Sequence, residues 1–206
     1  MTVTNVTKKK NKVIVSFDED EDLIFPYELF LKNTLFEDDE VTEKERETYS
    51  NEIQLYLIKQ NSFRYLSGRN HSKFELKVKL LKKKYNKELI EVILNELEDL
   101  KYLDDKEFAN YYFKIKLKRK KGVRLIQAEL SKKGVRREII EEVSLDFIDD
   151  PILEKSALII SEKKLLVLKR KDLSKSQLRQ KVFQFLMRKG YSTEIIKSTI
   201  DKLKFE

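Results

Sequence analysis

Two adjacent carboxylates, Asp104 and Asp105, have the residue type and spacing that acid–base or metal chemistry needs in this 206-residue sequence. The segment after them has helical periodicity, and an Asp at the N-cap followed by an acidic first turn stabilises a helix start. We therefore interpret the pair as a helix cap. His71 is the only histidine, and we expect it on the surface because it stands beside another helix start. Gly122 and Gly134 resemble a phosphate-binding loop only superficially, since helix termination accounts for both.

The composition removes several classes of protein. The sequence has no cysteine, one histidine and four glycines. Without cysteine there is no disulfide, no Cys-ligated zinc or iron–sulfur centre and no thiol nucleophile. A single histidine gives no support to a Ser-His-Asp triad, and the four glycines form neither a Rossmann fingerprint nor a P-loop. We therefore expect a protein that is not an enzyme and that has no metal site and no cofactor.

Apolar residues are frequent but never form a long run. The longest apolar runs are about four or five residues, whereas a membrane-spanning helix needs about 20. The segment MTVTNVTKKK at the start lacks the apolar core of a signal peptide. Lys, Glu, Leu and Ile dominate a composition with few turn residues, which favours helices. We expect a soluble, cytoplasmic, helical protein that makes no membrane contact.

Positive charge is concentrated in the second part of the sequence. Residues 1–68 hold 9 basic and 14 acidic side chains, a net of −5, whereas residues 69–206 hold 35 and 22, a net of +13. The stretch 114–137 has 11 basic side chains and one acidic residue, Glu129. A second basic run lies at 163–181. Such fields attract polyanions, chiefly nucleic acid or an acidic protein surface. The charge distribution alone is explained equally well by a helix face that contacts only solvent.

Eight cations within this stretch form the candidate contact surface: Lys114, Lys118, Lys121, Arg124, Lys132, Lys133, Arg136 and Arg137. Spacings of four and three residues place Lys114, Lys118 and Lys121 on one helix face. A purely solvated face would more often mix both signs, so we favour a surface that binds a polyanion. Five tyrosines offer base stacking, but their helical phase favours the core or a repeat interface: Tyr85, Tyr102, Tyr111, Tyr112 and Tyr191.

The periodicity divides the chain into an N-terminal segment and a series of repeats. Alternating apolar residues predict a two-stranded β-hairpin at 13–25, and Pro26 opens a short helix. From residue 42 the period is helical, and about nine helices begin at capping signals. Leu80, Leu130 and Leu186 occupy equivalent positions in three similar segments of the sequence. Successive members are 50 and 56 residues apart, a repeat length that suits a three-helix unit.

The predicted fold is all-α, an elongated and curved array of three tandem three-helix repeats after a short β-hairpin and helix. The expected boundaries are 1–40 for the hairpin and helix, 41–103 for repeat 1, 104–149 for repeat 2 and 150–206 for repeat 3. Each unit is too small to bury a good core alone, so neighbouring repeats must share surface.

Four segments resemble the RecX family of bacterial recombinase regulators. YLDDKEFANYY (102–112) and KKGVRLIQAELSKKGV (120–135) are similar to its aromatic-Leu-Asp-Asp-x-x-Phe-Ala and Glu-Leu-x-x-Lys-Gly patterns. SKFELKVKLLKKKY (72–85) and RQKVFQFLMRKGYSTEII (179–196) look like segments of its first and third repeats. Two lysines, Lys84 and Lys101, depart from the family pattern, because glycine is expected at both positions.

The resemblance implies a non-enzymatic regulator that binds the RecA–DNA filament and inhibits its ATP hydrolysis and strand exchange. That function belongs to homologous recombination, DNA repair and the SOS response. The partner is then the RecA filament, with single-stranded DNA contacted indirectly or weakly, and we expect a monomer. The basic surface leaves a second interpretation open, a stand-alone helical module that binds nucleic acid.

Overall fold

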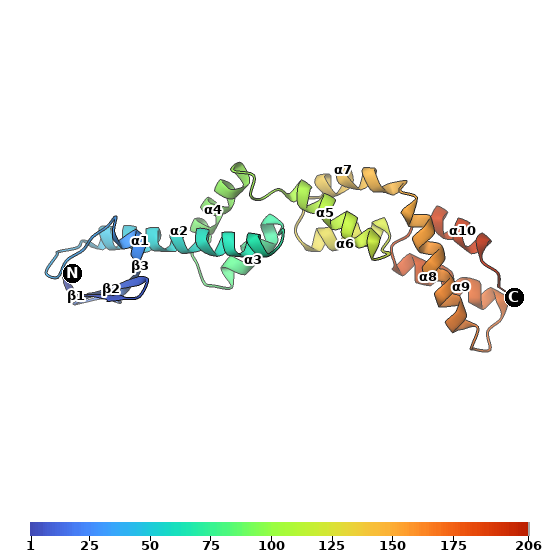
Figure 1. Ribbon diagram of the computed structural model, residues 1–206, viewed down its shortest axis with the longest axis horizontal. Coiled ribbons are helices and arrows are strands. Elements are labelled where there is room, and N and C mark those ends of the chain that lie inside the picture. Colours follow the sequence, from blue (N-terminus) through green and yellow to red (C-terminus); the bar gives the residue numbers. More distant parts are fainter. Residues whose placement is uncertain (206) are drawn as a thin grey trace. The chain divides into compact units, whose positions relative to one another are not determined.

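The computed structural model describes residues 1–205, which form two compact units (Figure 1). One unit contains Met1–Asn70 and Leu76–Leu103, and the other contains His71–Glu75 and the chain from Asp104 onward. The division passes through helix α3 (Lys73–Leu81), whose first turn belongs with the second unit. Within residues 1–205, no helix combines the length and the apolar character that crossing a bilayer requires.

The N-terminal segment is a three-stranded antiparallel sheet in the order β1-β2-β3, followed by a short helix. Its elements are β1 (Val3–Lys9), β2 (Lys12–Phe17), β3 (Leu23–Pro26) and α1 (Tyr27–Phe30). Strands β2 and β3 are the predicted hairpin, and Val13, Val15 and Phe17 are buried on one face as alternation requires. Strand β1 was not expected, because its sequence VTNVTKK has only two apolar residues and gives a weak strand signal.

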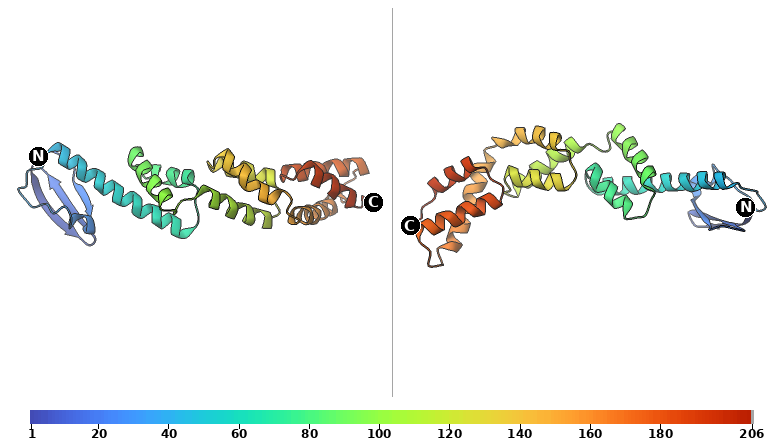
Figure 2. Two further views of the ribbon diagram at one scale, coloured as in Figure 1. Left: turned by 90° about the horizontal axis from the view of Figure 1, so that it is seen from above. Right: turned by 180° about the vertical axis from the view of Figure 1, so that it is seen from behind.

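Helix α2 (Glu43–Gly68) connects the sheet with the first three-helix repeat (Figures 1 and 2). Thr42 and Glu45 form the capping box that the sequence predicts. Ile53 belongs to the cluster of buried side chains under the sheet, whereas Ile58 belongs to the cluster formed with α3 and α4 (Lys87–Asp99). The first half of α2 therefore supports the N-terminal segment, and its second half is the first helix of repeat 1.

Six further helices form the second and third repeats. They are α5 (Asp105–Lys118), α6 (Val123–Lys132), α7 (Arg137–Ile148), α8 (Ile152–Leu168), α9 (Lys175–Arg188) and α10 (Thr193–Lys202). Asp104, Ser174 and Ser192 cap α5, α9 and α10 with side-chain oxygens, as predicted. Helices α2 to α10 are the nine that the sequence predicts after residue 42, counted over residues 1–205.

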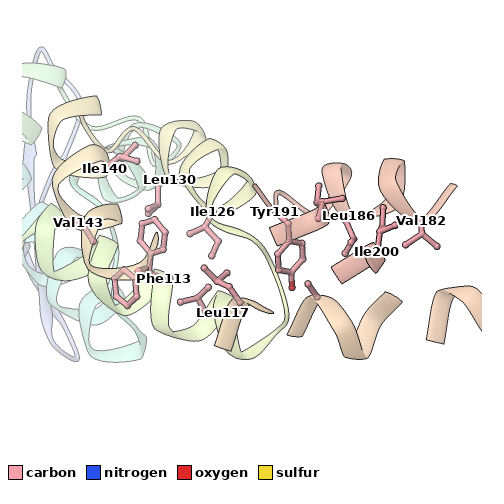
Figure 3. Close-up of a cluster of buried hydrophobic side chains, with 14 of the residues drawn as sticks. Phe113, Leu117, Ile126, Leu130, Ile140, Val143, Val182, Leu186, Tyr191 and Ile200 are labelled. Atoms are coloured by element: carbon pink, nitrogen blue, oxygen red, sulfur yellow. The ribbon is translucent and has the colours of Figure 1, made fainter. Parts of the chain in front are cut away.

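A single cluster of buried side chains runs through α5 to α10 (Figure 3). Phe113 stacks on Phe147 with ring centroids 4.9 Å apart, and Tyr191 lies beside Leu186 in the third repeat. The buried residues of the two repeats belong to the same cluster. The expectation that neighbouring repeats share surface is thus confirmed for the second and third repeats.

Three expectations about individual side chains were wrong. Tyr102 and Tyr111 are 57% and 51% exposed, rather than buried in the core or at a repeat interface. Helix α5 instead buries Ala109, Phe113 and Leu117, because both neighbouring helices of the repeat contact it. His71 is buried, not on the surface, since the segment that contains it packs on the turn between α6 and α7.

Candidate nucleic-acid interface

Six of the eight predicted cations are exposed in the second repeat. Lys114 and Lys118 lie on α5, Arg124 and Lys132 lie near the two ends of α6, and the pair Arg136–Arg137 begins α7. Arg137 makes an ion pair with Glu141 at 2.7 Å, but its side chain stays 85% exposed, and such surface pairs contribute little to stability. These six side chains are available to a partner, together with Arg119, which the prediction omitted.

The other two predicted cations, Lys121 and Lys133, are half-buried and held in ion pairs inside the protein. Helix α5 ends at Lys118, and the chain reverses so that the amide of Lys121 donates to the carbonyl of Lys116 at 3.1 Å. The predicted helix face therefore stops at Lys118. The side chain of Lys121 turns to Glu129, with which it forms a short ion pair.

Glu129 is the centre of a polar cluster in the second repeat. The hydroxyl of Tyr112 donates to its Oε2 at 2.8 Å, and Nζ of Lys116 lies 3.5 Å from the same oxygen. Burial disfavours the charged form of Glu129, but the hydrogen bonds from Lys121 and Tyr112 outweigh that effect and lower its pKa. Burial, and then the bond to Glu129, raise the pKa of Tyr112. Glu129 is therefore ionised and Tyr112 neutral at pH 7.

Lys133 connects this cluster to the first turn of α3. Its Nζ pairs with the carboxylate of Glu75 and lies 5.4 Å from the centroid of the Tyr112 ring. Its main-chain carbonyl accepts from the hydroxyl of Ser72 at 2.6 Å. Phe74 lies so close to Gly134 that a Cβ there would be 2.3 Å from the Cβ of Phe74. Lys133 thus has a structural role that the sequence did not indicate.

The start of α6 is positioned by the third repeat through main-chain contacts. The amide of Gly122 donates to the carbonyl of Lys189 at 2.8 Å, and the amide of Arg124 donates to that of Gly190 at 3.0 Å. A Cβ at Gly122 would lie 2.2 Å from the carbonyl carbon of Gly190. We call this contact the repeat 2–3 joint. It explains why glycine stands at both positions.

Lys84 occupies in repeat 1 the position that Gly134 and Gly190 occupy in the other repeats. Its φ of 63° is close to the 73° and 85° of the two glycines, so the backbone turn is the same. In repeat 1 no preceding three-helix repeat approaches this turn. Helix α2 covers it instead, because Gln54 accepts from the amide of Asn86 at 3.0 Å. Lys84 is itself exposed, so its side chain extends into solvent rather than toward a neighbouring repeat.

The second basic run is also exposed for most of its length. Lys163, Lys169 and Arg170 are exposed on α8 and on the turn after it. Lys164 and Lys189 both lie 5.7 Å from the ring centroid of Phe185, which is half-buried on α9. Cation–aromatic contacts of this kind organise the lysines without neutralising their charge.

The carboxylate pair that was considered for chemistry has a structural role. Asp104 accepts hydrogen bonds from the amides of Lys106 and Glu107 at 2.8 and 2.9 Å, and Asp105 accepts from the amide of Lys73 at 2.9 Å. Over residues 1–205, His, Asp and Glu side chains form no group of three that could hold a metal ion. The arrangement offers exposed cations for binding.

Three family models match the chain, one for each repeat. The first, second and third three-helix domains of RecX match residues 59–97, 104–143 and 155–200. These matched segments correspond to the end of α2 with α3 and α4, to α5–α7, and to α8–α10.

Proteins and crystal structures with the same family name are similar along most of the chain. Regulatory protein RecX of Clostridium botulinum (strain Eklund 17B / Type B) is 30% identical over 97% of this chain and 93% of its own length. Regulatory protein RecX of Clostridium tetani is 31% identical over 100% of this chain and 94% of its own length. A crystal structure of regulatory protein RecX shares the fold with a TM-score of 0.73, at 20% identity over 98% and 99% of the two chains. The crystal structure of RecX from Lactobacillus salivarius gives a TM-score of 0.65 at 26% identity, over 73% of this chain and 96% of that chain. On these matches, the chain belongs to the RecX family of regulatory proteins.

Proposed function

We propose that this regulator binds the RecA–DNA filament and lowers its rates of ATP hydrolysis and strand exchange. Membership of the RecX family supports a regulatory role, and the observation that carries the choice of surface is the group of exposed cations on the second repeat. This function places the protein in recombinational DNA repair in the cytoplasm, as a partner that acts by binding.

A filament on DNA presents phosphate and protein surface together, and a basic repeat array fits both. The exposed cations Lys114, Lys118 and Arg119 lie on α5 or directly after it, and the run at 163–171 adds more on the third repeat. In this proposal the repeats 41–103, 104–149 and 150–206 each make weak contacts. Weak contacts on one chain add through effective concentration, so the whole chain binds more tightly than any repeat alone.

The test is a titration of RecA ATPase activity on single-stranded DNA with the purified chain. We expect hydrolysis to fall as the chain is added, and to fall much less with a Lys114→Glu, Lys118→Glu double variant. A Lys82→Glu, Lys83→Glu variant is the matched control, because both lysines are exposed in repeat 1 and the change in net charge is the same. Unchanged ATPase and strand exchange at stoichiometric amounts of the chain would refute the proposal.

A second function, a stand-alone nucleic-acid-binding module, is favoured by the net charge of +13 over residues 69–206. It predicts useful affinity for single-stranded DNA without RecA, with a slope of log K against log salt of about −0.7 per neutralised phosphate. Charge reversal of Lys118, Arg124 and Arg136 then weakens binding equally for all sequences. Tight binding to RecA filaments with negligible affinity for bare DNA would decide for the first function.

A further inference from the structure

Three lysines of the second repeat are paired with carboxylates rather than with solvent. Glu129 holds Lys116 and Lys121, whose side chains are 16% and 26% exposed, and Glu75 holds Lys133, which is 26% exposed. The two carboxylates are themselves 23% and 15% exposed. Each lysine can therefore be reached from solvent, but its ammonium group already has an oxyanion partner.

The Tyr112 ring keeps these ion pairs together. Lys116 and Lys133 lie 4.6 and 5.4 Å from its centroid, and its hydroxyl donates to Glu129. A carboxylate and a nucleic-acid phosphate offer the same kind of partner to an ammonium group, an anionic oxygen that accepts charge-assisted hydrogen bonds. A strand bound by the exposed cations of the same repeat would hold its phosphate oxygens near this cluster at high local concentration.

We propose that Glu75 and Glu129 act as internal anions that occupy Lys116, Lys121 and Lys133 until phosphates of a bound single strand displace them. This inference rests on the proposed function, since it concerns regulation of the same basic surface. It divides the cations of the second repeat into an exposed group that makes first contact and a masked group that is recruited afterwards.

Recruitment of Lys133 has a structural consequence. Glu75, Ser72 and Phe74 are the residues through which the first turn of α3 contacts the turn at Lys133 and Gly134. Displacing Glu75 from Lys133 removes an ion pair from this contact. Binding of a strand therefore loosens the first turn of α3 against the second repeat.

The test compares the affinities of full-length variants for a fluorescein-labelled oligothymidylate. Glu75→Gln and Glu129→Gln remove the negative charge that holds the lysines, while glutamine keeps the size of the side chain and an oxygen that can accept from Tyr112 at position 129. Each freed lysine that takes up a phosphate steepens the salt slope by about 0.7, which corresponds to a gain of about eightfold in affinity between 1 M and 50 mM salt. Glu75→Asp shortens the side chain without changing the net charge, and it too is expected to raise the affinity.

Two controls separate unmasking from a general charge effect. Glu142→Gln makes the same charge change on the second repeat, at an exposed pair with Lys106 outside the cluster. It should leave the salt slope unchanged. In a Lys133→Gln background the gain from Glu75→Gln should vanish. Equal gains from Glu142→Gln and Glu75→Gln, or a gain that persists without Lys133, would overturn the inference.

Amide hydrogen exchange provides a readout that does not depend on any variant. Exchange at residues 72–75 of the unmodified chain should accelerate when the oligothymidylate is added, while exchange at the capped start of α9 stays constant. Unchanged exchange at 72–75 under saturating oligothymidylate, or no binding by any variant, contradicts the inference. Because RecA is absent from these assays, such a failure leaves the ATPase titration as an independent test of the proposed function.

Discussion

Replacing Gly190 by alanine should destabilise the repeat 2–3 joint strongly. Gly190 has a φ of +85°, which costs a residue with a Cβ about 1–2 kcal/mol. The added Cβ would also lie 2.3 Å from the amide nitrogen and 2.5 Å from the Cβ of Leu125, and overpacking of this kind costs about 1–3 kcal/mol. The expected loss in the free energy of unfolding is therefore about 2–5 kcal/mol.

Two companion variants separate the backbone conformation from the close approach. Gly122→Ala tests the close approach alone, because the φ of Gly122 is −79° while its added Cβ would lie 2.2 Å from Gly190. We expect a loss of about 1–3 kcal/mol. Lys84→Gly tests the conformation alone, since Lys84 has a φ of 63° and is exposed. Relief of the left-handed backbone and the entropic cost of glycine oppose each other there, so the change should stay within about 1 kcal/mol.

The assay is urea unfolding followed by far-ultraviolet circular dichroism, with the midpoint and slope fitted for each variant. The order of destabilisation should be Gly190→Ala, then Gly122→Ala, then Lys84→Gly. If the two alanine variants lose no more stability than Lys84→Gly, main-chain contact at the joint does not determine how the second and third repeats pack.

Three further predictions concern the second repeat. Asp104→Ala removes the N-cap of α5 and should lower the free energy of unfolding by about 1 kcal/mol, measured by urea unfolding against Asp146→Ala at an exposed position. Phe113→Ala removes a fully buried ring that stacks on Phe147 and should cost about 3–5 kcal/mol, so a thermal midpoint within a degree of the parent contradicts the packing. The folded-state pKa of Glu129 is lowered, so its ionisation stabilises the fold above the unfolded-state pKa, and this contribution is lost as pH falls through the folded pKa. Glu129→Gln should therefore be less stable than the parent at pH 7, and the difference should shrink as the pH falls through the folded-state pKa of Glu129; a difference that stays constant in acid argues against the ion pairs as its cause.

Helix boundaries and caps were accessible from the sequence because they depend on local chemistry. Thr42 with Glu45, Asn86 and Asp104 each accept hydrogen bonds from the amides that the capping patterns specify. Such bonds join residues two or three positions apart, so the sequence contains both partners. Strand β1 was missed for the opposite reason, since its pairing with β2 depends on a register that polar residues specify weakly.

The candidate surface was predicted only in part because charge does not reveal pairing. Lys121 and Lys133 were grouped with the exposed cations, yet each faces a glutamate, and Glu75 lies 58 residues from its partner in the chain. A signal was available for Lys121. Glu129 is the single acid among 11 cations in 114–137, and an isolated carboxylate in such a run is a candidate internal partner.

The joint between the second and third repeats consists largely of main-chain atoms, with amides of one turn donating to carbonyls of another. Every residue has a peptide group, so substitutions on the exposed helix faces do not remove the main-chain hydrogen bonds of the repeat 2–3 joint, provided that Gly122 and Gly190 remain. Substitutions on the exposed faces of the second and third repeats can therefore change charge and polarity without altering the hydrogen bonds that join the two repeats.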